Sequence, residues 1–299
     1  MKTPISIEQF KAFVELKDYR PKTKKEYVRC LGKVSQHYGC DPADLTEDQV
    51  RRYFLFLRQD KKLSGSGMTI VKASLHCFFV QQLGKTDWKV FSELVIRRPE
   101  TLPVVLSREE VAKVLGALKE ERFRISLRLI YHCGLRVSEA VGIQVSDLKD
   151  QRLHVRNGKG GKDRYVPISP GMVQELRVWW KLHRHPKLLF PAPARTWRER
   201  SLPLSQVMGS ATTHMSVSAV QNAFRLARAQ SGIHPEATVH TMRHSYATHL
   251  LEEGVSLRLI SQYLGHTSLD TTVIYTHLTA TSEEKALQAL EKLHSALPH

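Results

Sequence analysis

Several features that mark other protein classes are missing from this sequence. No run approaches the ~20 apolar residues that a membrane-spanning helix needs, and residues 1–10 lack the apolar core of a signal peptide. Only four cysteines occur, and they form no CxxC pair and no regular pattern: Cys30, Cys40, Cys77 and Cys133. We therefore expect a cytoplasmic protein without a membrane segment, whose thiols are reduced and mostly buried.

Metal-binding and repeat patterns are also missing. His240 and His244 stand four residues apart, but the HExxH pattern of zinc hydrolases is absent. No segment repeats at a fixed period. We expect no metal ion and no other cofactor, and we interpret His244 and His249 as buried histidines with hydrogen-bond partners.

Acidic residues are few beside basic ones. The chain has 29 Asp and Glu against 45 Lys and Arg, a net charge of +16. The excess is spread along the chain, which predicts a wide surface that binds a polyanion with strong salt dependence. Nucleic acid is the expected partner, although lysines that only keep a protein in solution would give the same composition.

The first 97 residues show the pattern of four helices. Apolar residues recur at helical spacing, as in Phe10, Phe13 and Val14, so each helix is expected to bury one stripe against the others. Three helices are expected to open with a capping box, and the fourth to follow a Ser-Gly segment: Ser6 with Gln9, Thr23 with Glu26, Thr46 with Gln49, and Ser64–Gly67. Residues 1–97 are therefore predicted to form a compact helical domain.

Basic residues follow the exposed faces of these predicted helices. Solvated helix faces often look the same, so contact with DNA phosphates is one of two interpretations. The candidates for DNA contact are Lys22, Lys24, Lys25, Arg51, Arg52 and Lys72, together with Lys162 in the second half of the chain.

Residues 98–106 lack a helical pattern and contain prolines that favour extended backbone, so we predict an interdomain linker there. Ser107 and Glu110 then form a capping box that opens a second, mainly helical domain over residues 107–299. Residues 192–214, rich in Pro, Ser, Thr and Arg, are predicted to form an irregular surface insertion whose role the sequence leaves open.

One hairpin is predicted inside the second domain. Leu153 and Val155 alternate on one expected strand, and Val166 and Ile168 on the other. The glycine-rich tip between them places Lys159 on an arm.

The GLRVSE segment carries the first candidate site residues. It follows an apolar helical pattern over Phe123–His132, which Gly134 is expected to end. Arg136, in the first turn of the next helix, would present a planar fork to a phosphate, while Glu139 fixes its orientation. A surface ion pair would show the same spacing.

Two further helices carry histidines and a second arginine. His240 and Arg243 lie at the start of a predicted helix that Gly254 closes. The next predicted helix, Leu257–Leu264, leaves His266 just past its C-terminus, where an imidazole can donate a hydrogen bond in either protonation state.

A tyrosine follows this group of cations. Tyr275 lies on a third predicted helix that runs from Leu269 to about Thr276. A phenol with two arginines, a lysine and two histidines available to it has no obvious role in metal, cofactor or acyl chemistry. It suits attack on a phosphodiester, because cations favour the phenolate and stabilise the charge that grows on the phosphate. The pattern therefore predicts DNA strand cleavage.

Five separated motifs occur in a fixed order: GLRVSE, GKGGKDRYVPI, HTMRHSYATHLLEEG, LGHTSLDTT and IYTH. Through them the whole chain resembles the tyrosine recombinases, or phage-integrase family, and most of all the bacterial Xer-type members. The long segment 192–214 gives it some likeness to integron-type integrases. The resemblance implies an active site in which Arg136, Lys159, His240, Arg243 and His266 surround the nucleophile Tyr275, with Glu139 as a supporting acid.

The resemblance also implies a fold and an assembly. The expected fold is mainly α: an N-terminal four-helix core-binding (SAM-like) domain, then a mixed α/β, mostly helical catalytic domain with a small β-hairpin or sheet. Residues 282–297 show an apolar helical stripe, which would suit docking on its own domain or on a neighbour. The resemblance implies exchange between protomers in a tetramer on double-stranded DNA recombination sites, of identical chains or with a paralogue.

The activity that the resemblance implies is site-specific cleavage and rejoining of DNA through a 3′-phosphotyrosyl link, in integration, excision or mobile-element recombination. Two alternatives stay open. A type IB topoisomerase-like enzyme would use the same chemistry without a specific site. A DNA-binding accessory protein would have lost catalysis.

Overall fold

The computed structural model describes residues 4–96, 103–156, 163–193, 203–266 and 270–273. The chain divides into two compact units, Met1–Thr101 and Leu102–His299. In these described ranges, no helix combines the length and the apolar character needed to cross a membrane. All four cysteines are free thiols, three of them buried, in agreement with the expectation from the sequence.

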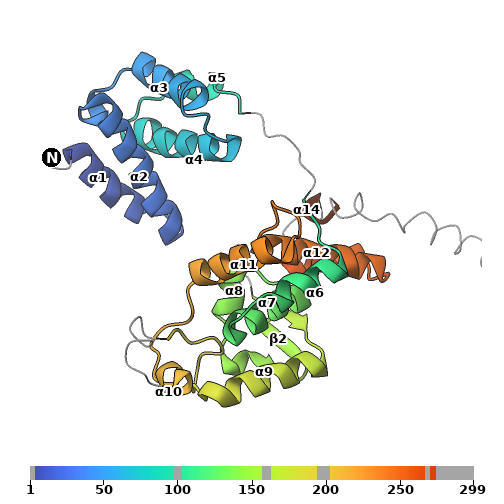
Figure 1. The fold of residues 1–299 in the computed structure, drawn as a ribbon. Coiled ribbons are helices and arrows are strands. Elements are labelled where there is room, and N and C mark those ends of the chain that lie inside the picture. Colours follow the sequence, from blue (N-terminus) through green and yellow to red (C-terminus); the bar gives the residue numbers. More distant parts are fainter. Residues whose placement is uncertain (1–3, 97–102, 157–162, 194–202, 267–269, 274–299) are drawn as a thin grey trace, which may run out of the picture. The chain divides into compact units, whose positions relative to one another are not determined.

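The described part of the N-terminal unit is built from helices packed around one core (Figure 1). They are α1 (Ile5–Glu15), α2 (Pro21–Tyr38), a 3-10 helix (Pro42–Asp44), α3 (Glu47–Gln59), α4 (Gly65–His76), a π-helical segment (Cys77–Gln82) and α5 (Val90–Glu93). The first four α-helices are those predicted, and α5 is additional. Their apolar stripes meet in the core, where the rings of Phe10 and Phe78 pack edge to face with centroids 5.3 Å apart.

Only one of the three predicted capping boxes forms in this unit. Thr46 and Gln49 cap α3 reciprocally, as predicted. The box at Ser6 is wrong, because Asp41, which follows α2, accepts a hydrogen bond from the Ser6 amide at 3.3 Å and α1 already begins at Ile5. The box at Thr23 is also wrong: proline suits the first position of a helix, so α2 begins at Pro21 and Thr23 lies inside it.

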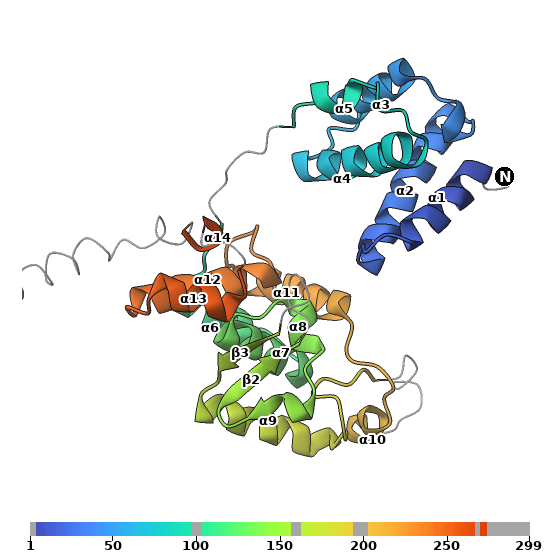
Figure 2. The same ribbon diagram turned by 180° about the vertical axis from the view of Figure 1, so that it is seen from behind.

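The second unit is mostly helical with one small sheet (Figures 1 and 2). Its elements are α6 (Arg108–Gly116), α7 (Glu121–Cys133), α8 (Val137–Val141), a 3-10 helix (Val145–Asp147), β1 (Leu148–Lys149), β2 (Arg152–Val155), β3 (Arg164–Pro167), α9 (Pro170–His183), α10 (Leu204–Gly209), α11 (Val217–Ser231), α12 (Val239–Glu252), α13 (Leu257–Leu264) and α14 (Asp270–Val273). The apolar helix α7 packs against both α12 and α9. The predicted fold class, mainly helical with a small sheet, is confirmed.

The predicted hairpin is present, with a third strand beside it. The sheet has the order β1-β2-β3 and is antiparallel, with Leu153 paired to Val166 in its buried register. The tip at 157–162, with Lys159 and Lys162, lies outside the described residues.

The segment 192–214 is more regular than predicted. Pro191 pairs with His214 in an isolated bridge, and α10 packs against α9 with Met208 1% exposed. The prediction of an irregular surface insertion is therefore wrong for Leu204–Gly209, which form α10 because apolar side chains such as Met208 gain a buried position against α9. Residues 210–214 are irregular and mostly exposed, as predicted. Residues 194–202 lie outside the described ranges.

Candidate active site

The start of α8 is fixed by a close approach between helices. Gly134 ends α7 with φ +60°, and a Cβ there would lie 2.4 Å from the ring of Tyr246 on α12. Glycine is therefore required both for the left-handed backbone and for the packing. The turn delivers Arg136 to the N-cap of α8, where its backbone amide donates to Glu139 Oε2 at 2.8 Å and its Nη1 to Oε1 at 2.7 Å.

Glu139 is the centre of this network. Its side chain is 7% exposed, and Arg164 donates to both of its oxygens, Nη1 to Oε1 at 3.0 Å and Nη2 to Oε2 at 2.7 Å. Nη1 of Arg243 lies 3.9 Å from Oε2. Burial alone would raise the pKa of this carboxyl, but the hydrogen bonds and charge of Arg164, and then the hydrogen bonds of Arg136, lower it to about 2. The carboxylate is therefore ionised at neutral pH.

Arg243, on α12, is 1% exposed and joins three helices. Its Nη1 donates to the Gly134 carbonyl and its Nη2 to the Leu264 carbonyl, each at 2.6 Å, at the C-terminal ends of α7 and α13. Carbonyls at helix ends lack intrahelical partners and carry partial negative charge, so a buried guanidinium is well compensated there. The same Nη2 lies 3.2 Å from Nε2 of His266.

The contacts of His266 favour one tautomer of the neutral imidazole. A guanidinium can only donate, so Nε2 facing Arg243 is the acceptor and the proton resides on Nδ1. Nδ1 then donates to Thr272 Oγ1 at 2.8 Å, and Thr272 lies on α14, buried. His266 thus links Arg243 to the last described helix.

His240 completes the described part of the group, one turn before Arg243 on α12. Its side chain reaches solvent. Desolvation by the surrounding protein nevertheless lowers the pKa of its imidazole below 6.5, and the positive charges of Arg243 and Arg136 lower it further. His240 is therefore neutral at pH 7, with a ring nitrogen that can accept a hydrogen bond or a proton.

The structure thus brings together Arg136, Glu139, Arg243 and His266, with His240 within electrostatic reach. Lys159 and Tyr275 lie outside the described residues. Of the other two histidines of α12, His249 is buried and bonded to Tyr131 Oη at 2.7 Å, as predicted. His244 is half-buried, its ring packs edge to face on that of His240, and desolvation lowers its pKa to about 4.

Arg164 is the residue that the sequence analysis missed. It begins β3, two positions before the buried Val166, so strand alternation turns its side chain towards the buried face. A charged residue at an inward position of a strand is a signal for a specific partner, and here that partner is Glu139.

The candidate DNA contacts in the N-terminal unit fall into two groups. Lys24 pairs with Glu15 at 3.0 Å, and Lys72 donates to the Leu94 carbonyl at 2.9 Å. Arg51 and Arg52 pair with carboxylates of their own unit: Glu47, Asp48 and Glu93. Lys22 and Lys25 are exposed on α2 and are more available to DNA.

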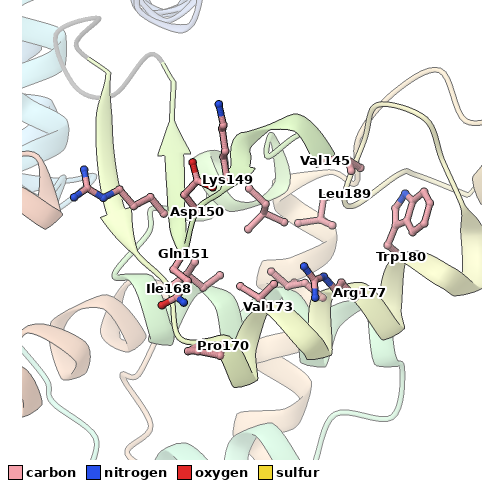
Figure 3. Close-up of a pocket in the computed structure, with 13 residues that line it drawn as sticks. Val145, Lys149, Asp150, Gln151, Ile168, Pro170, Val173, Arg177, Trp180 and Leu189 are labelled. Carbon is pink, nitrogen blue, oxygen red and sulfur yellow. The ribbon is translucent and has the colours of Figure 1, made fainter.

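A cavity of about 500 Å³ lies elsewhere on the second unit, between the β1–β2 turn and α9 (Figure 3). Its lining combines apolar side chains such as Val173 and Leu189 with basic ones such as Arg177. None of the predicted site residues that the structure describes lines it. Within the described ranges, no group of three His, Cys, Asp or Glu side chains could hold a metal ion.

Comparison with known proteins covers both units. The family described as "Phage integrase family" matches residues 104–282, and "Phage integrase, N-terminal SAM-like domain" matches residues 7–89. Tyrosine recombinase XerA of Thermococcus kodakarensis is 31% identical over 96% of this chain and 96% of its own. An integrase/recombinase of Escherichia coli is 31% identical over 91% of this chain and 89% of its own.

The fold is also that of solved recombinase structures. A lambda integrase tetramer bound to a Holliday junction matches with a TM-score of 0.71 and 17% identity, over 90% of this chain and 76% of the other. The two family matches, residues 7–89 and 104–282, fall in the two separate units of the structure. The chain belongs to the phage integrase family, the tyrosine recombinases.

Proposed function

We propose that this protein is a site-specific DNA recombinase that cleaves and rejoins strands through a 3′-phosphotyrosyl link. The observation that carries the proposal is the meeting of Arg136 and Arg243 at one buried carboxylate, with His266 bonded to Arg243. Two guanidiniums at one point form a site for a single phosphate, since guanidinium donors match phosphate oxygens in geometry and charge.

The proposed nucleophile is Tyr275. A free tyrosine has a pKa of ~10, so about one in a thousand is ionised at pH 7. Arg136 and Arg243 would favour the phenolate and bind the non-bridging oxygens in the transition state. Charge-assisted hydrogen bonds of ~1.5–3 kcal/mol each make two arginines a large part of the barrier reduction.

Proton transfer would be divided among the remaining residues. The phenol oxygen bonds to phosphorus while the bond to the 5′-oxygen breaks, and Lys159 would protonate that leaving oxygen. His240, neutral at pH 7 because of its lowered pKa, suits acceptance of the phenol proton. His266 would hold Arg243 in place. One phosphoester replaces another, so the step needs no energy from ATP hydrolysis and can run in reverse onto a new strand.

The proposed substrate is a duplex recombination site to which both units of the chain bind. Lambda integrase, whose fold this chain shares, is captured as a tetramer on a Holliday junction, which supports a tetramer here. Residues 282–297 would supply the exchanged helix that joins neighbouring protomers, identical or paralogous. Deleting residues 282–299 is expected to abolish tetramer formation and strand exchange on DNA; unchanged assembly would count against this role.

Cleavage on a nicked suicide substrate tests the proposed function. The substrate is a duplex selected from a random-sequence library by covalent capture with the wild-type chain. Tyr275→Phe is expected to bind this duplex with unchanged affinity and to form no covalent adduct, because the attacking oxygen is gone. Adducts formed by this variant would remove Tyr275 from the role, and relaxation of any supercoiled plasmid by a monomer would favour a topoisomerase.

A further inference from the structure

Arg164 is a buried charge to which the proposed reaction gives no task. Its side chain is 8% exposed, and its donors face inward: Nε to the Tyr263 carbonyl at 2.7 Å, Nη1 and Nη2 to the two oxygens of Glu139. Such a guanidinium is not a surface contact for DNA. The desolvation cost of a buried guanidinium must be offset by specific hydrogen bonds, so the partners of Arg164 indicate its role in the site.

The backbone around His266 holds this guanidinium in place. Gly265 ends α13 with φ +63°, and a Cβ there would lie 3.0 Å from Cδ and 3.3 Å from Nε of Arg164. The end of α13 therefore packs directly on the arginine. Its strand, β3, leads back to the hairpin tip that carries Lys159.

Arg164 occupies half of the bonding capacity of Glu139. A carboxylate offers about four lone-pair positions. Arg136 takes two of them, through its amide and Nη1, and Arg164 takes the other two. Nη1 of Arg243, which donates to the Gly134 carbonyl, lies 3.9 Å from Oε2, beyond hydrogen-bond distance.

The charges explain what this arrangement achieves. Three guanidiniums and one carboxylate give a net charge of +2 (3 − 1), which attracts a phosphate of charge −1. Without Arg164 the balance falls to +1 (2 − 1), and Glu139 has two open positions beside Arg136 and Arg243. The carboxylate would then compete with the scissile phosphate for the same donors.

We propose that Arg164 is a positioning residue that saturates Glu139, so that the carboxylate does not draw Arg136 and Arg243 away from the positions in which they bind the scissile phosphate. This inference rests on the proposed function. It makes a specific claim that general stabilisation of the fold does not: the effect of removing Arg164 depends on the negative charge of Glu139.

A double-mutant cycle tests that dependence. The variants are Arg164→Gln, Glu139→Gln and the double variant, with Arg152→Gln, an exposed arginine of β2, as the matched control. The rate of adduct formation is measured at saturating amounts of the selected nicked duplex. Arg164→Gln is expected to lower it about 100-fold, the size of effect that a small misplacement of reacting groups produces. In the Glu139→Gln background the same change is expected to cost less than about threefold, since the competing charge is absent.

Arg164→Lys provides a second variant that keeps the charge but loses the fork. Its rate of adduct formation is expected to lie between those of wild type and Arg164→Gln, because one ammonium group cannot form the two parallel hydrogen bonds that the guanidinium forms with Glu139. Circular dichroism and thermal unfolding establish that each variant is folded. Equal losses from Arg164→Gln in both backgrounds would overturn the proposal, as would wild-type rates in Arg164→Gln.

Two readouts need no DNA cleavage and separate this inference from the proposed function. Carbon-13 NMR of the Glu139 carboxyl is expected to show its pKa rising from about 2 towards the ordinary range in Arg164→Gln. Inorganic phosphate binding, followed through the Nε signals of Arg136 and Arg243, is expected to weaken about tenfold in Arg164→Gln and not in the double variant. If the wild-type chain forms no adduct, the proposed function fails, while these readouts still decide the role of Arg164.

Discussion

At the scale of single residues, Glu139 combines burial with a full set of hydrogen bonds. Burial penalises its charge, and the bonds from Arg164 and Arg136 more than repay the penalty. A carboxyl whose pKa is depressed on folding stabilises the folded state above its ordinary pKa, and this contribution is lost as the pH falls through the folded value.

We therefore predict acid sensitivity that depends on Glu139. A shift from 4.5 to about 2 corresponds to about 3 kcal/mol, fully present above pH ~4.5 and lost as the pH falls towards 2. Denaturant unfolding measured across this window is expected to show a smaller loss of stability in Glu139→Gln than in wild type. Parallel curves for the two proteins would contradict the prediction.

Two glycines provide a second test at this scale. Gly265 and Gly232 both end helices with positive φ, +63° and +66°, but a Cβ meets nothing within 4 Å at Gly232 and meets Arg164 at Gly265. Gly232→Ala is expected to cost about 1 kcal/mol, from backbone strain alone. Gly265→Ala is expected to cost more and to slow adduct formation, because it displaces Arg164; equal unfolding free energies and rates would contradict this.

At this scale the sequence motifs predicted most of the site residues but did not indicate the role of Arg164. The motifs contained Arg136, Glu139, Arg243 and His266, which the structure brings together, and His240, which lies within electrostatic reach of them. Arg164 stood in one of the same motifs without a role, because its importance depends on facing Glu139, 25 positions earlier in the chain. The positions of Arg164 and Glu139 in the sequence do not reveal that they are in contact.

At the scale of elements, helix ends were predicted correctly where neighbouring residues alone determine them. The bounds of α13 are those predicted, because the serine cap at Ser256 and the left-handed Gly265 each act within one turn of the helix end. The caps at Ser6 and Thr23 failed because a distant aspartate and a nearby proline define those ends instead.

This difference gives a prediction for helix capping. Thr46→Ala is expected to destabilise the N-terminal unit by about 1 kcal/mol, since it removes the acceptor for the Gln49 amide. Thr23→Ala, inside α2, is the matched control and is expected to change stability by less than about 0.5 kcal/mol. Thermal unfolding measures both, and equal effects would show that Thr23 caps its helix after all.

At the scale of the whole molecule, the net charge of +16 dominates. If 6–10 phosphates are contacted, DNA affinity is expected to fall about 10³–10⁵-fold between 50 and 200 mM salt. Fluorescence anisotropy with a random-sequence duplex measures the salt slope, which is the slope of the logarithm of the DNA affinity against the logarithm of the salt concentration. A slope near zero would exclude the extended basic surface inferred here.

The two groups of basic side chains in the N-terminal unit are expected to differ in this measurement. Lys22→Gln with Lys25→Gln removes two exposed charges and is expected to reduce the salt slope by about 2. Arg51→Gln with Arg52→Gln is the matched control. Its slope is expected to change by less than about 1, because Glu47, Asp48 and Glu93 already pair with these arginines.

The sequence by itself determined the helical class, the basic character and the identity of the candidate catalytic residues, because periodicity, composition and motif spacing are local properties of the chain. Only the tertiary structure decided how the charges are shared. Arg136, Arg164 and Arg243 come from three different elements, and which of them Glu139 neutralises depends on distances that folding creates. The strength of an electrostatic interaction follows separation and burial in space, and neither can be read from position in the sequence.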